Sequence, residues 1–249
     1  TPPERQTTLF SATMPPATPT PTATPSNVTA SPTITLVRDG GWAGKIIQSG
    51  DSVRFNQTVL FQGTAPSSSV IKVYLNNTVV EQISSGPSGE FNFMWMDTGN
   101  TEGTYTLGFT ATQAPFAEST QTQFVIVVDG TEPYLQSLTA KADPIFNVAP
   151  KITVYFNEEI EVFDMNAFTF PSVWHVAIII GTSAFNVTQV ELNADGESVT
   201  LTGNWMTDHL DLGDQLAVTF HYVPLMGVTD KAGNPFNAAL NVATGVVTP

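Results

Sequence analysis

Apolar and polar side chains alternate in short runs along most of the chain, with the two-residue period of β-strands. Between residues 70 and 75, for example, Ile71, Val73 and Leu75 share one face. Turn-forming residues separate this run from similar ones at residues 34–37, 59–63, 91–95, 105–109 and 124–128. About seven short strands without a helical period predict a β-sandwich in this part of the chain.

A second set of alternating runs begins at Tyr134. Ile152, Val154 and Phe156 share one face, and further apolar runs follow at residues 168–170, 173–180, 187–192, 199–201 and 216–220. The only helical turn that we expect lies near residues 162–167, because no segment has an amphipathic pattern of three turns. The sequence therefore predicts a second β-sandwich and an all-β protein.

Two breaks in the pattern divide the chain. Residues 129–133 (DGTEP) combine Gly and Pro with carboxylates, which indicates a domain junction. Residues 15–26 are rich in Thr and Pro and favour extended, polyproline-like backbone. We therefore expect an extended N-terminal Thr/Pro-rich arm over residues 1–32, one sandwich over 33–130 and another over 131–249.

The arm contains one candidate strand, at residues 7–14. Phe10, Ala12 and Met14 would share one face of this strand and Leu9 the other. An apolar strand needs a cover, and the sheet edges of sandwiches accept added strands. We expect these four residues to pair with another copy of the chain, giving a head-to-tail polymer; a flexible, glycosylated spacer is the alternative.

Composition narrows the range of partners. The 249 residues include 22 acidic and 8 basic side chains, for a formal charge of −14, which argues against nucleic acid and anionic lipid. Cysteine is absent, and the longest apolar run, residues 176–180, is too short for membrane insertion within this chain. Abundant Thr, Ser, Asn, Gly and Pro favour an extracellular or cell-surface protein. Because Thr1 carries no signal-peptide pattern, we expect a processed mature form or a fragment.

Two segments resemble known families of extracellular modules. Residues 34–129 resemble the bacterial Ig-like repeats of surface adhesins, through the phrases VLFQGTA (59–65), SGEFNF (88–93), EGTYTL (102–107) and VVDGTEP (127–133). Residues 133–237 resemble the Ig-like domain of surface-layer proteins, through ITVYFNEEI (152–160) and GVTDKAGNP (227–235). Both resemblances imply tandem non-catalytic modules of adhesins, surface layers, filaments or multimodular secreted enzymes.

Calcium is the cation that the resemblance implies, because tandem adhesin repeats often bind it between domains. Asp129, Glu132 and the junction carbonyls supply the oxygen ligands that calcium prefers, and the loop around Asp230 is a further source. The alternative is an ordinary acidic linker, since no complete calcium-loop motif is present. No other cofactor is expected.

Catalytic residues are not evident. The chain has no cysteine and no Gly-x-Ser-x-Gly, and we expect His175, His209 and His221 in separate strands or turns. The acidic residues around His209 are typical of a solvated turn. Strand alternation puts Glu159 and Glu161 on one face and Glu158 on the other. The resembled family has acidic residues here without a catalytic role, which implies that all three are surface residues. Residues 97–102 (DTGNTE) predict a hairpin loop, with weaker cation-binding potential.

Two features of the sequence relate to sugars. Asn-x-Ser/Thr sequons permit glycans at four positions: Asn27, Asn56, Asn76 and Asn186. Trp42 lies in a Gly-rich loop context and could stack on a sugar or pack over the domain edge, whereas Trp95 is expected in the core.

The function predicted from the sequence is a non-catalytic extracellular structural or adhesive protein. Its assembly through the N-terminal arm would make it a subunit of a surface filament or surface layer. The alternatives are an accessory Ig-like module pair of a secreted carbohydrate-active enzyme and a sugar-binding module.

Overall fold

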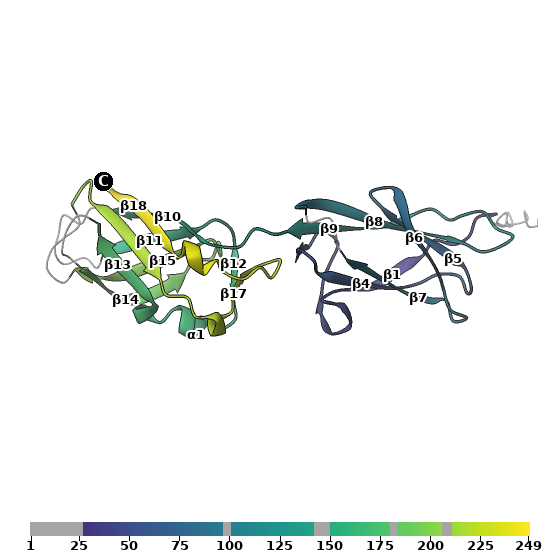
Figure 1. The fold of residues 1–249 in the computed structure, drawn as a ribbon, viewed down its shortest axis with the longest axis horizontal. Helices are drawn as coiled ribbons and strands as arrows, with labels where there is room; N and C mark the ends of the chain where they lie inside the picture. The colour runs from purple at the N-terminus through teal and green to yellow at the C-terminus, as the bar shows by residue number, and fades with distance from the viewer. Residues whose placement is uncertain (1–26, 97–100, 142–149, 180–183, 206–210) are drawn as a thin grey trace, which may run out of the picture.

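A computed structural model describes residues 27–96, 101–141, 150–179, 184–205 and 211–249. Figure 1 shows two β-modules in line along the longest axis, joined by a short extended segment. We call them the N-terminal module (residues 33–129) and the C-terminal module (residues 135–248).

The N-terminal module consists of two sheets packed face to face. One sheet has the order β2 (Lys45–Ile46), β1 (Thr33–Asp39), β4 (Thr58–Thr64) and β7 (Glu90–Met96), with a 3-10 turn at Gly41–Ala43. The other has the order β3 (Ser52–Arg54), β9 (Thr122–Asp129), β8 (Gly103–Thr112), β5 (Val70–Leu75) and β6 (Thr78–Ser84). The β3–β9 pair is parallel and the other pairs are antiparallel.

Phenylalanine rings fill the space between these two sheets. Phe61 is fully buried, and its ring centroid lies 5.4 Å from those of both Phe109 and Phe124. In β7, Phe91 and Phe93 point inward and Asn92, which lies between them, points outward, as the alternation predicted. Asn76 and Asn77 have positive φ and form the predicted hairpin turn between β5 and β6.

The strands of the C-terminal module form a closed ring. Their order is β10 (Leu135–Lys141), β11 (Lys151–Phe156), β15 (Ser198–Trp205), β14 (Ala184–Leu192), β13 (Trp174–Ile178), β16 (Gln215–Phe220) and β18 (Val242–Thr248). A short parallel pairing of β10 with β18 closes the ring. A separate two-stranded ribbon, β12 (Ile160–Val162) with β17 (Val228–Asp230), lies at the end that faces the N-terminal module (Figure 1).

Two kinds of element differ from the sequence prediction. Residues 168–170 are not a strand: Asp164 accepts a hydrogen bond from the Ala167 N–H and caps the helix α1 (Met165–Phe168), and 3-10 turns follow at Pro171–Val173, Pro224–Met226 and Ala238–Leu240. The strand β6 gave no alternating pattern because it is an edge strand with almost every side chain exposed. The sequence pattern detects a strand only where one of its faces is buried.

The fold is therefore all-β, as predicted, with one hydrophobic core in each module. The two clusters of buried side chains draw on residues before and after the junction, respectively. No helix within the described ranges is long and apolar enough to cross a bilayer.

Separate cores predict two independent unfolding transitions. Phe61→Ala should lower the free energy of unfolding of the N-terminal module by about 3–5 kcal/mol, because it empties a fully buried site. Phe220→Ala, at the equivalent place in the other core, should act only on the C-terminal module. Differential scanning calorimetry should show one transition moving in each variant, and a joint shift of both transitions would contradict the separation.

Candidate cation centre at the module junction

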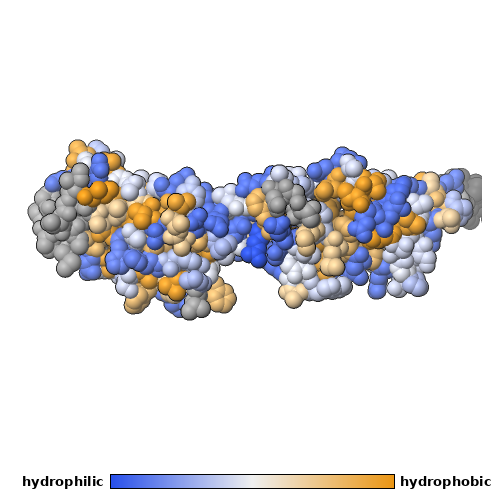
Figure 2. Space-filling view, viewed as in Figure 1, coloured by the Kyte–Doolittle hydropathy of each residue, from blue (hydrophilic) through white to orange (hydrophobic). Residues whose placement is uncertain are grey.

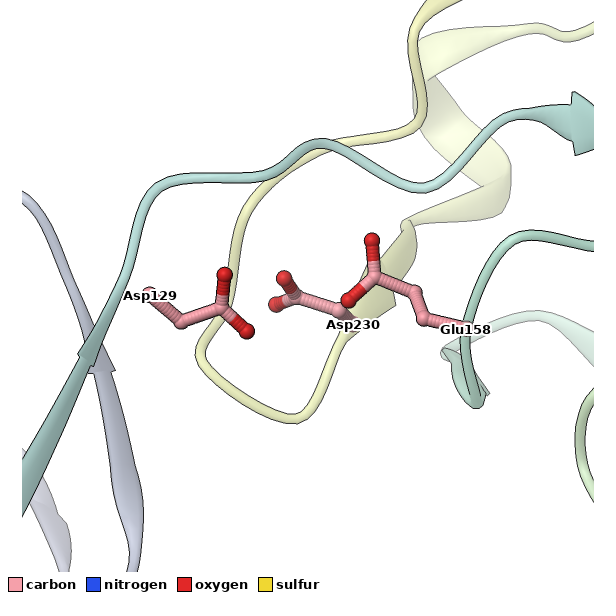
Figure 3. A group of neighbouring side chains, drawn as sticks. All are labelled: Asp129, Glu158 and Asp230. Carbon is pink, nitrogen blue, oxygen red and sulfur yellow. The ribbon is translucent and has the colours of Figure 1, made fainter. Parts of the chain in front are cut away.

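Three carboxylates from the two modules meet at the junction. Asp129 ends β9 of the N-terminal module, while Glu158 follows β11 and Asp230 ends β17 of the C-terminal module. One oxygen of each lies within 4.8 Å of the others. Figure 3 shows the three side chains pointing toward one another from three separate segments.

A tight turn after β17 fixes Asp230. The Asn234 N–H donates to Oδ1 of Asp230, and the Asn234 side-chain amide donates to Oδ2. Each of these two hydrogen bonds is 2.8 Å long. Gly233 supplies the positive φ that this turn requires. Asp230 is only 1% exposed, so the turn holds a carboxylate group away from water.

The same asparagine ties the linker to the C-terminal module. Nδ2 of Asn234 lies 3.0 Å from the carbonyl oxygen of Asp129 and 3.2 Å from that of Thr131. Asn234 is itself buried, so these hydrogen bonds are shielded from water. Asp129 is thereby brought against the C-terminal module although it belongs to the preceding strand.

Contacts within the N-terminal module hold the other side of the linker. Oε1 of Glu102 accepts hydrogen bonds from the Thr131 hydroxyl (2.8 Å) and the Gly130 N–H (3.3 Å). Gly130 lies so close to the ring of Phe55 that a Cβ atom would overlap it. Glycine is therefore required where the chain leaves the first module.

Asn157 positions Glu158. Its side-chain oxygen accepts a hydrogen bond from the Tyr134 N–H at 2.6 Å, and its Nδ2 donates to Oε1 of Glu158 at 2.9 Å. Because Tyr134 immediately precedes β10, this pair links the Glu158 loop to the end of the linker.

Burial and the neighbouring negative charges both raise the pKa values of two of the carboxylates. Burial is the main cause that raises the pKa of Glu158 to about 7, and the nearby charges of Asp230, Asp129 and Glu102 raise it further. Burial, followed by the same kind of repulsion, also raises the pKa of Asp129. Lys231 and Lys45 lie at this junction but pair with Glu159 (2.5 Å) and Glu161 (3.7 Å), respectively. The cluster therefore favours binding a proton or a cation.

The predicted site residues have different outcomes. Asp129 lies in the cluster with Asp230, whereas Glu132 is exposed and lies outside it. Glu158, predicted on the surface, is half-buried, and the chain bends after Phe156 so that strand alternation does not continue to that position. Whether calcium binds here stays a prediction.

The remaining predictions concern other parts of the molecule. All four sequon asparagines, namely Asn27, Asn56, Asn76 and Asn186, are exposed, and glycosylation stays a prediction. Trp95 is buried, as predicted, and Trp42 is 63% exposed. Leu9, Phe10, Ala12, Met14 and His209 lie outside the described residues. His175 and His221, expected in separate strands or turns, lie side by side with ring centroids 4.4 Å apart.

The raised pKa of Glu158 predicts an unusual pH dependence of the metal-free protein. Because the folded C-terminal module holds this proton more tightly than the unfolded chain, its stability should fall as pH rises from about 4.5 through about 7. Glu158→Gln should remove this slope. Melting temperatures measured in the presence of chelator between pH 5 and 8 test this prediction. In the wild type the melting temperature should fall by on the order of a degree or more across this range. Equal slopes in the wild type and the variant would contradict the assignment.

Comparisons with known proteins found similar solved structures and no similar sequence. No protein-family model matches the sequence, and no curated protein matches it. The fibronectin(III)-like modules of CbhA from Clostridium thermocellum are 12% identical, with a TM-score of 0.33 over 85% of this chain and 94% of that one. The BSP domain of a biofilm-associated protein is 16% identical, with a TM-score of 0.24 over 86% of this chain and 30% of that one.

A third similar structure is that of the titin domains z1z2 in complex with telethonin. It is 14% identical, with a TM-score of 0.27 over 89% of this chain and 97% of that one. Nothing about function follows from likenesses at these identities and scores. The chain is an all-β protein of two modules in tandem, a two-sheet sandwich followed by a closed ring of strands.

Proposed function

We propose that this chain is a non-catalytic extracellular structural or adhesive protein in which a calcium ion at the junction holds two modules in series. The observation that carries the proposal is the meeting of Asp129 with Glu158 and Asp230 across the two modules. A ligand shared by both modules opposes their bending and separation, which suits a protein that spans distance.

Calcium fits the donor set. The three carboxylates offer up to six oxygens, and calcium takes about six to eight oxygen ligands at flexible geometry. Water or the linker carbonyls would complete the shell. All the donors are oxygens, which favours a hard cation over the borderline transition metals.

The junction provides enough contact to position the cation and too little to make the modules rigid without it. Direct links across it include the Asn234 amide bonds to the linker and the Lys45–Glu161 ion pair, whose side chains are more than half exposed. Exposed ion pairs contribute little, typically below about 1 kcal/mol. Figure 2 shows hydrophilic residues gathered at the narrow waist between the modules. The carboxylate cluster is therefore the strongest available point of attachment once a cation neutralises it.

The sequence adds a mode of assembly to this function and also supplies an alternative function. Self-association through residues 7–14 would turn a stiff module pair into a surface filament or layer, and those residues lie outside the described part of the chain. A sugar-binding or enzyme-accessory role is the second candidate. Its supporting observation is the exposed ring of Trp42, in a 3-10 turn between β1 and β2.

Calcium binding is expected to stabilise the C-terminal module, because the ion binds the folded arrangement and not the unfolded chain. Isothermal titration of the chelator-treated protein should show one site, and calcium at about 100 times its Kd should add about 2.7 kcal/mol to the free energy of unfolding. Asp129→Asn and Glu158→Gln should each weaken binding at least tenfold.

Glu132→Gln is the matched control, because it removes an exposed carboxylate of the same linker that lies outside the cluster. It should leave calcium affinity unchanged. An equal loss in Glu132→Gln and Glu158→Gln would indicate general electrostatic attraction, and no calcium-dependent change in melting would overturn the proposal.

A further inference from the structure

Two histidines, His175 and His221, lie on the outer face of the C-terminal module. Neither belongs to the carboxylate cluster, and they offer nitrogen ligands where the cluster offers oxygen. β13 pairs with β16 so that Trp174 is opposite Phe220 and His175 is opposite Thr219. His221 follows β16, and its N–H donates to the carbonyl oxygen of Val173 at 2.8 Å. Strand pairing thus brings together two residues that are 46 positions apart (221 − 175).

The hydrophobic core fixes where the two imidazoles lie. Trp174 and Phe220 stack inside the module with ring centroids 4.4 Å apart, and both are buried. Their neighbours in the chain, His175 and His221, point to the other side and are exposed. Successive strand residues face opposite sides of a sheet, so the buried stack places the histidine pair.

We propose that His175 and His221 together bind a borderline transition-metal ion such as Cu²⁺ or Zn²⁺. Their ring centroids are 4.4 Å apart and their planes are inclined by 66°. With metal–nitrogen bonds of about 2.0–2.1 Å, two imidazoles at right angles around one ion have ring centres roughly 4.5 Å apart. The observed spacing of the ring centres matches that of two ligands at right angles on one ion, as in the square-planar coordination that divalent copper prefers.

The chemistry of this pair differs from that of the junction. Imidazole nitrogens prefer copper, nickel and zinc, whereas carboxylate oxygens prefer calcium and magnesium. Among the described residues, no third histidine or carboxylate joins the pair within metal-ligand distance. Water or a group from another molecule would occupy the remaining positions, which face solvent. The net charge of −14 adds a general attraction for cations.

Copper is the best probe, because divalent copper binds nitrogen ligands most tightly in the first-row series. The full chain, freed of metal with chelator and then exchanged into buffer, is titrated with Cu²⁺ by calorimetry and by electron paramagnetic resonance. The wild type should show one site with nitrogen hyperfine coupling. His175→Ala and His221→Ala should each weaken it at least tenfold, and the double variant should lose it.

Two controls separate this site from other sources of copper binding. His209→Ala removes one imidazole from elsewhere in the sequence and should leave Cu²⁺ affinity unchanged, and Glu132→Gln, which removes an exposed carboxylate, should do the same. Both paired histidines are exposed, so their variants should melt as the wild type does; His175→Gln and His221→Gln serve if an alanine variant does not. Unchanged Cu²⁺ binding in the double variant, or an equal loss in His209→Ala, would overturn the proposal.

Discussion

Repulsion among like charges at the junction is the constraint on which the arrangement of the two modules depends. Asp129, Glu158 and Asp230 place carboxylate oxygens within 4.8 Å of one another, and Asp230 is almost entirely buried. At such a separation each fully ionised pair costs about 3 kcal/mol at an effective dielectric constant of about 20. A cost of that size requires compensation by a proton or by a cation. Burial, and after it this repulsion, raises the pKa of Glu158 and so favours the proton, while the calcium ion proposed above would be the other form of compensation.

Several hydrogen bonds that hold the linker lie around the same cluster. The side-chain amide of Asn234 donates hydrogen bonds to Asp230 and to two linker carbonyls. Asn157 connects the Glu158 loop to the start of β10, and Glu102 holds Thr131 from the other side. Each module therefore contributes polar side chains that orient the carboxylates. The junction is a built arrangement, and an unstructured acidic spacer would not need these contacts.

The sequence predicts many of the strands that bury one face, although it misses β18, in which Ala243 and Val247 are buried, and it misses strands that lack a buried face. Alternation revealed β5, β7 and β8, but β6 is exposed along its length and β12 and β17 have only three residues each. Two of the three carboxylates of the cation centre could be predicted from the sequence. Asp129 and Asp230 fall in recognisable phrases, whereas Glu158 depends on a bend after β11 that interrupts the alternation. The neighbouring histidines depend on the pairing of β13 with β16, which no local pattern encodes.

Under the proposed function, a cation bound by both modules makes them one stiff body. Residual dipolar couplings of backbone amides, measured separately for the two modules in the full chain, test it most directly. With calcium the two modules should report the same alignment tensor, and after chelation at pH 8 the tensors should differ in magnitude and direction. Different tensors in the presence of saturating calcium, or identical ones after chelation, would contradict this account.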